Sequence, residues 1–381
     1  ANCLVGSEMC IRDRFLFVWI NFLNAQSNYE FDGQVLGQTN IGFGKEGTKF
    51  LGTRYIPEFT FDKEIDSLSS LSIETSFNLS LSKTNIPGHS SDVNSNFSPY
   101  RIWLRYLKKN WELRLGLQKI DFGSAQLLRP IQWFNQIDPR DPLGLTNGVY
   151  GLLIRHYFKN NSNLWLWGLY GNKKQRGLDA LTTLNDSPEF GGRFQTFIPK
   201  GEAALSYHYR EAEANNIPFF ENYSSPEHRI GFDSKIDIGF GMWTELTYVH
   251  RTKNIGILTN QLLLNFGVDY TFRIGNGLTV SKEYLFSDST DSMTNESLRR
   301  GFSALSFNYP LGLSSSLSGL IYQQWNNNTQ TLMLNYQQQF NSLSGYIILY
   351  YNPKTVEGIQ QNDIFQSFSG PGIQLLIVFN H

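Results

Sequence analysis

Apolar and polar residues alternate along most of this chain with a period of two. Near position 113, Trp111, Leu113 and Leu115 fall on one side of an extended backbone, whereas Glu112 and Arg114 fall on the other. Successive side chains of a β-strand point to opposite faces, so the alternation indicates strands with one apolar and one charged face. The pattern therefore predicts an all-β fold.

The alternating segments recur at regular intervals. Each is long enough to cross a bilayer as a tilted strand, which takes about 9 to 11 residues. The predicted strands are 28–40, 52–62, 71–83, 97–107, 111–121, 150–159, 163–171, 189–198, 201–211, 227–239, 241–251, 260–273, 277–287, 300–309, 312–324, 329–340, 343–352 and 370–380.

The connections between these strands are alternately short and long. Short turns at one end and long loops at the other are typical of transmembrane β-barrels. Two connections fit this rule less well, because 63–70 is long for a turn and 326–328 is short for a loop. We therefore predict a transmembrane antiparallel up-and-down β-barrel of about eighteen strands, with about sixteen as the alternative count.

The last predicted strand, 370–380, is apolar enough for a membrane but too short to cross one as a helix. A strand rises more than twice as far per residue as a helix, so the length fits a barrel wall. We expect Ile373, Leu375 and Ile377 to face outer-membrane lipid and this strand to close the barrel against the first. Aromatic residues near strand ends, such as Trp111, fit the interfacial girdle of such barrels.

Composition narrows the class of partner. The formal net charge is -1 and basic runs are missing, which argues against nucleic acid. Residues 12–25 combine arginines, an apolar run and small residues, and this pattern predicts a secretory signal peptide. Residues 1–11 resemble translated sequencing-adapter sequence and are expected to be non-native. Residues 26–381 are then a single barrel domain.

The longest predicted connection, 121–149, is rich in proline, aromatic and charged residues. Its three prolines restrict the backbone and stiffen the loop. A stiff loop suits a constriction folded into the lumen, while an ordinary surface loop is the alternative. The candidate constriction and solute-binding residues are Arg129, Trp133, Asp138, Arg140 and Asp141.

The predicted lumen wall carries arginines on neighbouring strands. Opposed charges in a narrow aqueous pore orient polar solutes and tune ion selectivity. In the alternative, these arginines only hydrate the interior and pair with carboxylates. The candidate wall residues, expected to face Asp138 and Asp141, are Arg101, Arg105, Arg114, Arg155 and Arg193.

One stretch resembles a known family. The run GLQKIDFG, followed by RPIQWFNQIDPRDPL, is similar to a motif of porin-like outer-membrane proteins of Bacteroidota, with related patterns in alginate-export-like and capsule-assembly-like barrels. The chain has Leu117 and Phe122 where that pattern often has arginine and tryptophan. The resemblance implies a barrel in the outer membrane of a Gram-negative bacterium.

These observations lead to three hypotheses on function. The first is an outer-membrane channel, monomeric or homotrimeric, for passive diffusion of small hydrophilic solutes or ions. The second is a barrel that binds or exports surface polysaccharide, with Trp133, Trp165 and Trp167 stacking on sugars. The third is a soluble secreted β-protein that binds glycans.

The sequence gives little support for an enzyme or a cofactor. No two of the six histidines have the spacing of metal ligands. Ser206 and His208 could be drawn as a nucleophile and base, but any serine-rich strand would allow that. The acidic loop 287–297 lacks the glycine and spacing of a calcium-binding EF-hand. We expect no catalysis, no metal and no cofactor.

Overall fold

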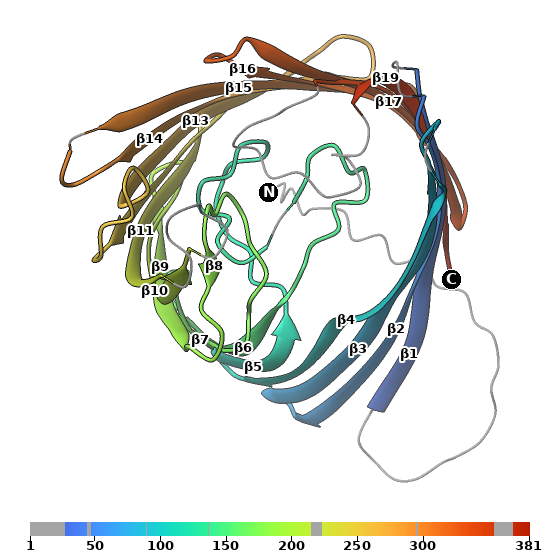
Figure 1. Cartoon of the computed structure of the whole chain (residues 1–381). Coiled ribbons are helices and arrows are strands. Elements are labelled where there is room, and N and C mark those ends of the chain that lie inside the picture. Colours follow the sequence, from blue (N-terminus) through green and yellow to red (C-terminus); the bar gives the residue numbers. More distant parts are fainter. Residues whose placement is uncertain are drawn as a thin grey trace.

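The fold is a closed β-barrel, described here from a computed structural model (Figure 1). The structure describes residues 27–43, 47–88, 90–135, 137–214, 223–294, 296–353 and 369–381. Its strands are β1 (Ser27–Gly42), β2 (Lys49–Asp66), β3 (Ser69–Asn85), β4 (Asp92–Lys108), β5 (Trp111–Gln118), β6 (Val149–Tyr157), β7 (Asn163–Leu169), β8 (Thr182–Thr183), β9 (Glu189–Ile198), β10 (Gly201–Glu213), β11 (Ser224–Asp237), β12 (Gly241–Arg251), β13 (Asn260–Phe272), β14 (Leu278–Thr290), β15 (Ser297–Pro310), β16 (Ser315–Gln324), β17 (Thr329–Phe340), β18 (Leu343–Asn352) and β19 (Gly370–Asn380).

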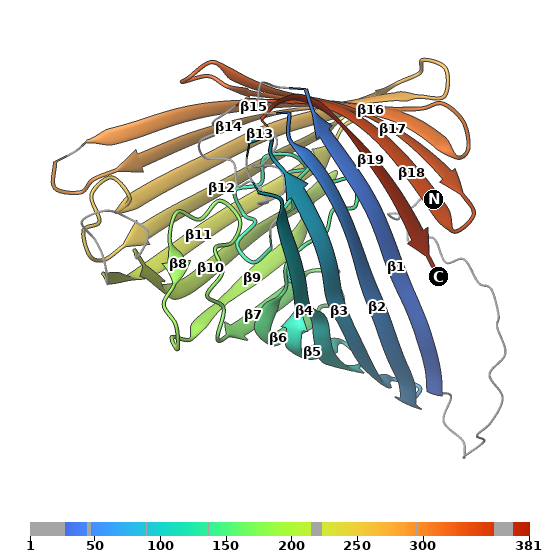
Figure 2. The ribbon, with the colours of Figure 1, turned by 45° about the vertical axis from the view of Figure 1, so that its right-hand side comes forward.

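Eighteen of these strands form the wall, which confirms the predicted fold class. The two-residue strand β8 pairs only with the end of β10, while β7 pairs directly with β9. The barrel closes because β1 pairs with both β2 and β19, and Figure 2 shows β1 and β19 side by side. At this seam Gln34 lies opposite Asn380 and Gly42 lies opposite Gly372.

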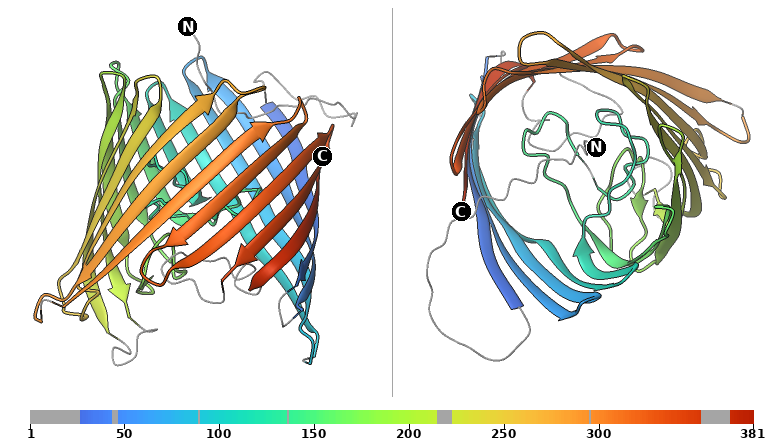
Figure 3. Two further views of the ribbon diagram at one scale, coloured as in Figure 1. Left: turned by 90° about the horizontal axis from the view of Figure 1, so that it is seen from above. Right: turned by 180° about the vertical axis from the view of Figure 1, so that it is seen from behind.

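The two connections that fitted poorly have simple explanations. Strands β2 and β3 extend further than predicted, so only residues 67 and 68 remain as a tight turn between them. The link between β16 and β17 is a genuine four-residue turn, 325–328, at the long-loop end. Figure 3 shows the wall strands tilted in one sense, as closure of a barrel requires.

The outer face of the barrel is apolar, as the alternation predicts. The side chains of Leu113, Ile230 and Ile377 are 37%, 51% and 57% exposed on that face. Arg114 and Asp233 point inward, with side chains only 16% and 4% exposed. A belt of exposed aliphatic and aromatic residues would be insoluble in water but is stable in hydrocarbon, where the closed ladder satisfies every backbone group of the wall. This belt rules out the soluble hypothesis.

The inner face is less uniformly charged than predicted. Four apolar clusters of the described residues lie where loops pack on the inner side of the wall. The aromatic cluster contains Phe122, Trp133, Phe134 and Trp167. The largest buried apolar groups therefore lie inside the barrel, because its loops need a surface to pack on.

The predicted leader 1–11 and signal peptide 12–25 lie outside the described residues. Within the residues that the structure describes, no helix is long and apolar enough to cross a bilayer.

Candidate functional site: the loops inside the barrel

The connection from β5 to β6, called loop 119–148 here, enters the lumen (Figure 1). Two inward-pointing carboxylates of the wall hold it. Glu283 of β14 accepts the backbone N–H groups of Gln126 at 2.7 Å, Leu127 at 3.1 Å and Leu128 at 2.6 Å. The same carboxylate accepts side-chain hydrogen bonds from Trp243 and Asn265. Five donors therefore converge on one buried group.

The second anchor of the loop is Glu245 of β12. Its carboxylate accepts the N–H groups of Ala125 at 2.7 Å and Ile131 at 3.3 Å. Gly123 has a φ of +105°, and a Cβ at that position would lie 2.4 Å from the Glu245 carboxylate. Glycine is required there both by the backbone conformation and by the close approach.

The aromatic cluster fixes the middle of loop 119–148. The ring of Phe122 stacks on Trp167 of β7 with centroids 5.8 Å apart, and Phe134 meets the same indole edge-on at 5.2 Å. Trp133 and Trp167 are 2% and 3% exposed. These two indoles have no open face for a sugar, so the structure gives the stacking hypothesis no surface at either residue.

The predicted constriction residues are held mainly by contacts within the loop. Arg129 pairs with Asp121 at 2.7 Å, and Arg140 pairs with Asp138 at 2.7 Å. Burial alone would raise the pKa of Asp121, but the charge of Arg129 and its hydrogen bond hold that pKa below the usual value.

Asp141 occupies a different position, at the inner surface of the loop. Its carboxylate accepts the N–H of Leu143 at 3.0 Å and faces Arg54 of β2. Burial raises the pKa of Asp141, although that N–H group and the charge of Arg54 oppose the shift. Among the predicted acidic residues, Asp141 is thus the one whose pKa responds to the charge of a wall arginine.

The predicted arginine wall is divided among several partners. Arg101 reaches loop 119–148 and donates to the Thr146 hydroxyl at 2.8 Å. Arg105 donates to Ser72 at 2.9 Å. The other three bind wall carboxylates, with Arg114 and Arg155 sharing Glu112 and Arg193 holding Asp233. The five arginines therefore do not form one surface opposite Asp138.

A second lumenal connection, called loop 170–188 here, links β7 to β9. Asp179 in this loop contacts Arg210 of β10 at 2.9 Å and Arg229 of β11 at 2.7 Å. Glu227 lies behind these arginines and also binds Arg251 of β12 at 2.6 Å. The five groups form a buried ionic network, called the Glu227 network below, that attaches the loop to the wall.

The two loops also pack directly on each other. Gly177 has a φ of +54°, and a Cβ there would lie 1.7 Å from the backbone carbonyl oxygen of Gln132. Gly171 in the same loop has a φ of +77° and nothing within 4 Å of its Cβ position. Both glycines thus have a left-handed backbone that would strain any residue with a Cβ, but of the two only Gly177 touches the other loop.

We predict that Gly177→Ala separates the loops, whereas Gly171→Ala costs only the strain of a left-handed residue, about 1 to 2 kcal/mol. Protease added to the folded barrel should cut loop 119–148 faster in Gly177→Ala than in Gly171→Ala. Equal rates of cleavage would contradict the close packing of the loops.

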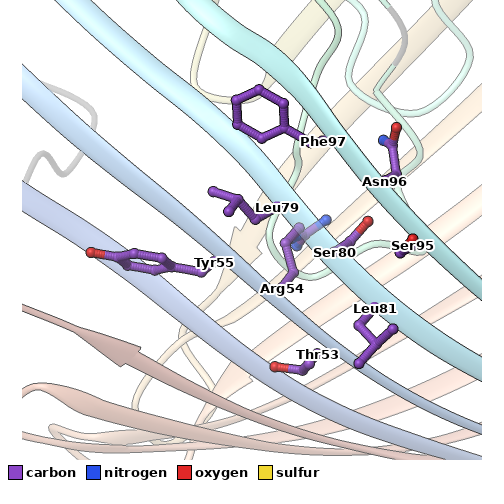
Figure 4. Close-up of a pocket in the computed structure, with 9 residues that line it drawn as sticks. All are labelled: Thr53, Arg54, Tyr55, Leu79, Ser80, Leu81, Ser95, Asn96 and Phe97. Atoms are coloured by element: carbon purple, nitrogen blue, oxygen red, sulfur yellow. The ribbon is translucent and has the colours of Figure 1, made fainter.

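A cavity of about 730 Å³ remains between the loops and the wall at β1 to β4. Figure 4 shows part of this wall, where Arg54, Ser80 and Asn96 come from β2, β3 and β4. Together with outward neighbours such as Tyr55, Leu79 and Phe97, the same three residues also line the groove of about 350 Å³ that Figure 4 shows. Loop residues that line the inner cavity are Asp141, Leu143, Leu145, Thr146, Asn147, Gly148, Gly171, Asn172, Lys173, Lys174, Gln175 and Arg176. The inner cavity is the candidate functional site.

The Ser206 and His208 pair does not have the geometry of a nucleophile and base. The Trp167 indole donates to Nδ1 of His208 at 3.1 Å, and Nε2 contacts Glu189 at 3.2 Å. Both ring nitrogens are therefore engaged away from Ser206, whose hydroxyl accepts from Arg193.

The acidic loop near Asp291 is a capped turn. The Asp291 carboxylate accepts the N–H of Met293 at 2.8 Å, and Asp288 pairs with Arg299. Among the described residues, no group of three or more His, Cys, Asp or Glu side chains is placed to hold a metal ion.

Sequence reasoning missed the anchors Glu245 and Glu283, the Glu227 network, and the cavity residues Arg54, Lys173 and Lys174. The alternation of apolar and polar residues does place those of them that lie in strands, such as Glu245, Glu283 and Arg54, on the inner face. It cannot indicate which inward carboxylate meets a loop, because that depends on contacts more than a hundred residues apart in sequence, such as Gln126 with Glu283.

Comparisons with known proteins show the fold. No protein-family model matches the chain, and no curated protein matches it in sequence. Among solved structures it is similar to OccK7 (OpdD) of Pseudomonas aeruginosa, with a TM-score of 0.54 and 11% identity over 93% of this chain and 99% of that chain. It is also similar to a loop-deletion mutant of OmpT, an outer membrane protein of Vibrio cholerae, with a TM-score of 0.52 and 8% identity over 93% and 99%.

A third solved structure, OccAB1 of Acinetobacter baumannii, matches with a TM-score of 0.51 and 10% identity over 93% of this chain and 96% of that chain. At these identities the likeness concerns the fold alone. Together with the closed ladder and the apolar outer belt, this fold identifies a β-barrel protein of the bacterial outer membrane.

Proposed function

We propose that this barrel is a channel for passive diffusion of small hydrophilic solutes or ions, and that loop 119–148 narrows its lumen. The supporting observation is the cavity beside β1 to β4. The loops fill the lumen along β12 to β16, where Glu245, Glu283 and the apolar clusters hold them. Space remains on the opposite side, between Asp141 and the serine- and asparagine-rich wall of β3 and β4.

The chemistry of this space suits water and polar solutes. Ser80, Ser82 and Asn96 provide hydroxyl and amide groups that exchange hydrogen bonds with a hydrated solute. Arg54 and Asp141 add opposite charges on the two sides. The polysaccharide hypothesis has less support, because Trp133 and Trp167 are buried in the aromatic cluster.

Reconstitution into planar bilayers tests the channel and its narrowing. We expect steady single-channel conductance from the intact barrel and a larger conductance after deletion of residues 138–141. The deletion removes the buried Asp138 and Arg140 pair and also Asp141, which borders the cavity.

A matched control is deletion of residues 292–294, which are exposed in the turn between β14 and β15. This deletion should leave the conductance unchanged. A barrel that migrates as folded on gels but does not conduct would refute the channel. Equal conductance of the intact and 138–141-deleted barrels would refute the narrowing alone.

A further inference from the structure

The charges that line the cavity are unbalanced. Arg176 is paired with Glu189 at 2.5 Å, and Asp141 and Arg54 oppose each other. Lys173 and Lys174 are exposed, and among the described residues neither ammonium group has a carboxylate within ion-pair distance. These two lysines therefore give the described lining of the cavity a net positive charge.

The position of the two lysines is fixed by the segment that follows them. Arg176 donates to Thr183 at 2.9 Å as well as to Glu189. Gly177 packs on loop 119–148, and Asp179 joins the Glu227 network. Lys173 and Lys174 lie only a few residues before these anchors, so their backbone is held at the cavity while their side chains stay exposed.

Acidic residues elsewhere on the same wall lie nearer the short turns than the cavity does. Glu58 and Glu74 lie on the inner face, nearer the short turns than the cavity is. Arg101 is close enough to interact with both. Arg114 also acts on Glu74. Glu30, Asp32 and Asp62 share this inner face still closer to the short turns. The positive charge of Lys173 and Lys174 is therefore local to the cavity, among the described residues that line it.

We infer that the cavity selects small anionic solutes and that Lys173 and Lys174 determine this selectivity. The inference rests on the proposed channel function. Fixed charges beside a narrow aqueous path raise the local concentration of ions of opposite sign and lower that of ions with the same sign. Both effects change the ratio of anion to cation permeability in the same direction. Each lysine therefore raises this ratio by attracting anions and also by repelling cations.

The test is the reversal potential of the reconstituted channel across a gradient of potassium chloride. We expect chloride to be more permeant than potassium in the intact protein. One charge about 8 Å from the ion path in water changes the chloride to potassium ratio by roughly fivefold. The double variant Lys173→Glu/Lys174→Glu should therefore make the channel cation-selective.

The matched control is Lys108→Glu/Lys159→Glu, which makes the same change of charge at the exposed end of β4 and in the exposed turn after β6, both at the opposite rim. It should shift the permeability ratio far less. Because all four lysines are exposed, gel migration of the heated and unheated barrel should show both variants folded.

The outcomes separate this inference from the channel itself. A conducting intact barrel that prefers potassium, or a loop variant that keeps its chloride preference, overturns the inference and leaves the channel standing. An equal shift in the control variant also overturns the role of Lys173 and Lys174. A folded barrel without conductance overturns the channel and this inference together.

Discussion

Replacement of Glu283 by alanine should release loop 119–148 from the wall and raise the single-channel conductance about twofold or more. The substitution leaves the N–H groups of Gln126, Leu127 and Leu128 without their acceptor. Each buried donor left unpaired costs about 1 to 3 kcal/mol. The loop can recover that loss only by moving these groups into water, and this movement carries it off the wall.

Glu283→Gln should have an intermediate effect on the conductance. Glutamine keeps the shape and one acceptor oxygen but loses the charge, so its conductance should lie between those of the intact protein and Glu283→Ala. The adjacent Lys282 points outward, and Lys282→Ala is the control that should change nothing. The anchoring role would be refuted if Glu283→Ala conducted like the intact barrel and its loop resisted protease equally.

Replacement of Glu227 by alanine should give the largest loss of stability. Glu227 is buried and contacts Arg210, Arg229 and Arg251, each at 2.6 Å. Without it, Asp179 is the remaining carboxylate of the Glu227 network, and three guanidinium groups stay buried. Removing one partner of a buried ion pair in this way lowers the free energy of unfolding by about 3 to 5 kcal/mol. The folded band on unheated gels should disappear at a clearly lower temperature than in the intact barrel.

An exposed ion pair supplies the control for Glu227. Asp288 pairs with Arg299 at 3.1 Å, but the Arg299 side chain is 70% exposed. Surface pairs contribute about 0 to 1 kcal/mol, so Asp288→Ala should hardly shift the unfolding temperature. If both variants unfolded at the same temperature, burial of the Glu227 network would not be what stabilises this part of the barrel.

The carboxylates Glu245 and Glu283 and the Glu227 network hold the two loops in different ways. Glu245 and Glu283 bind backbone N–H groups, so they fix the path of loop 119–148 whatever its side chains are. The Glu227 network binds the side chain of Asp179, so it depends on that one residue. Loop 119–148 is therefore held mainly through its backbone, whereas loop 170–188 is held through the Asp179 carboxylate, the Arg176 and Glu189 pair and the pairing of β8 with β10.

The sequence by itself determined the barrel. The period of two assigns most wall residues to the lipid or the lumen, apart from irregular positions such as Tyr100. A closed ladder is the one β arrangement that leaves no unpaired edge in a membrane. The alternation in WELRLGLQ places Leu113 outward and Arg114 inward, as the structure has them. These properties are local, so a single sequence carries them.

Only the tertiary structure decided what the lumen contains. Asp138 pairs with Arg140 instead of facing the arginine wall. The wall arginine whose charge acts on Asp141 is Arg54, which the pattern did not single out. The path of loop 119–148 depends on Glu245 and Glu283, which lie more than a hundred residues further along the chain. Alternation fixes the face of a strand but not the depth of a residue in the barrel or its partner across the lumen, because both follow from register and closure.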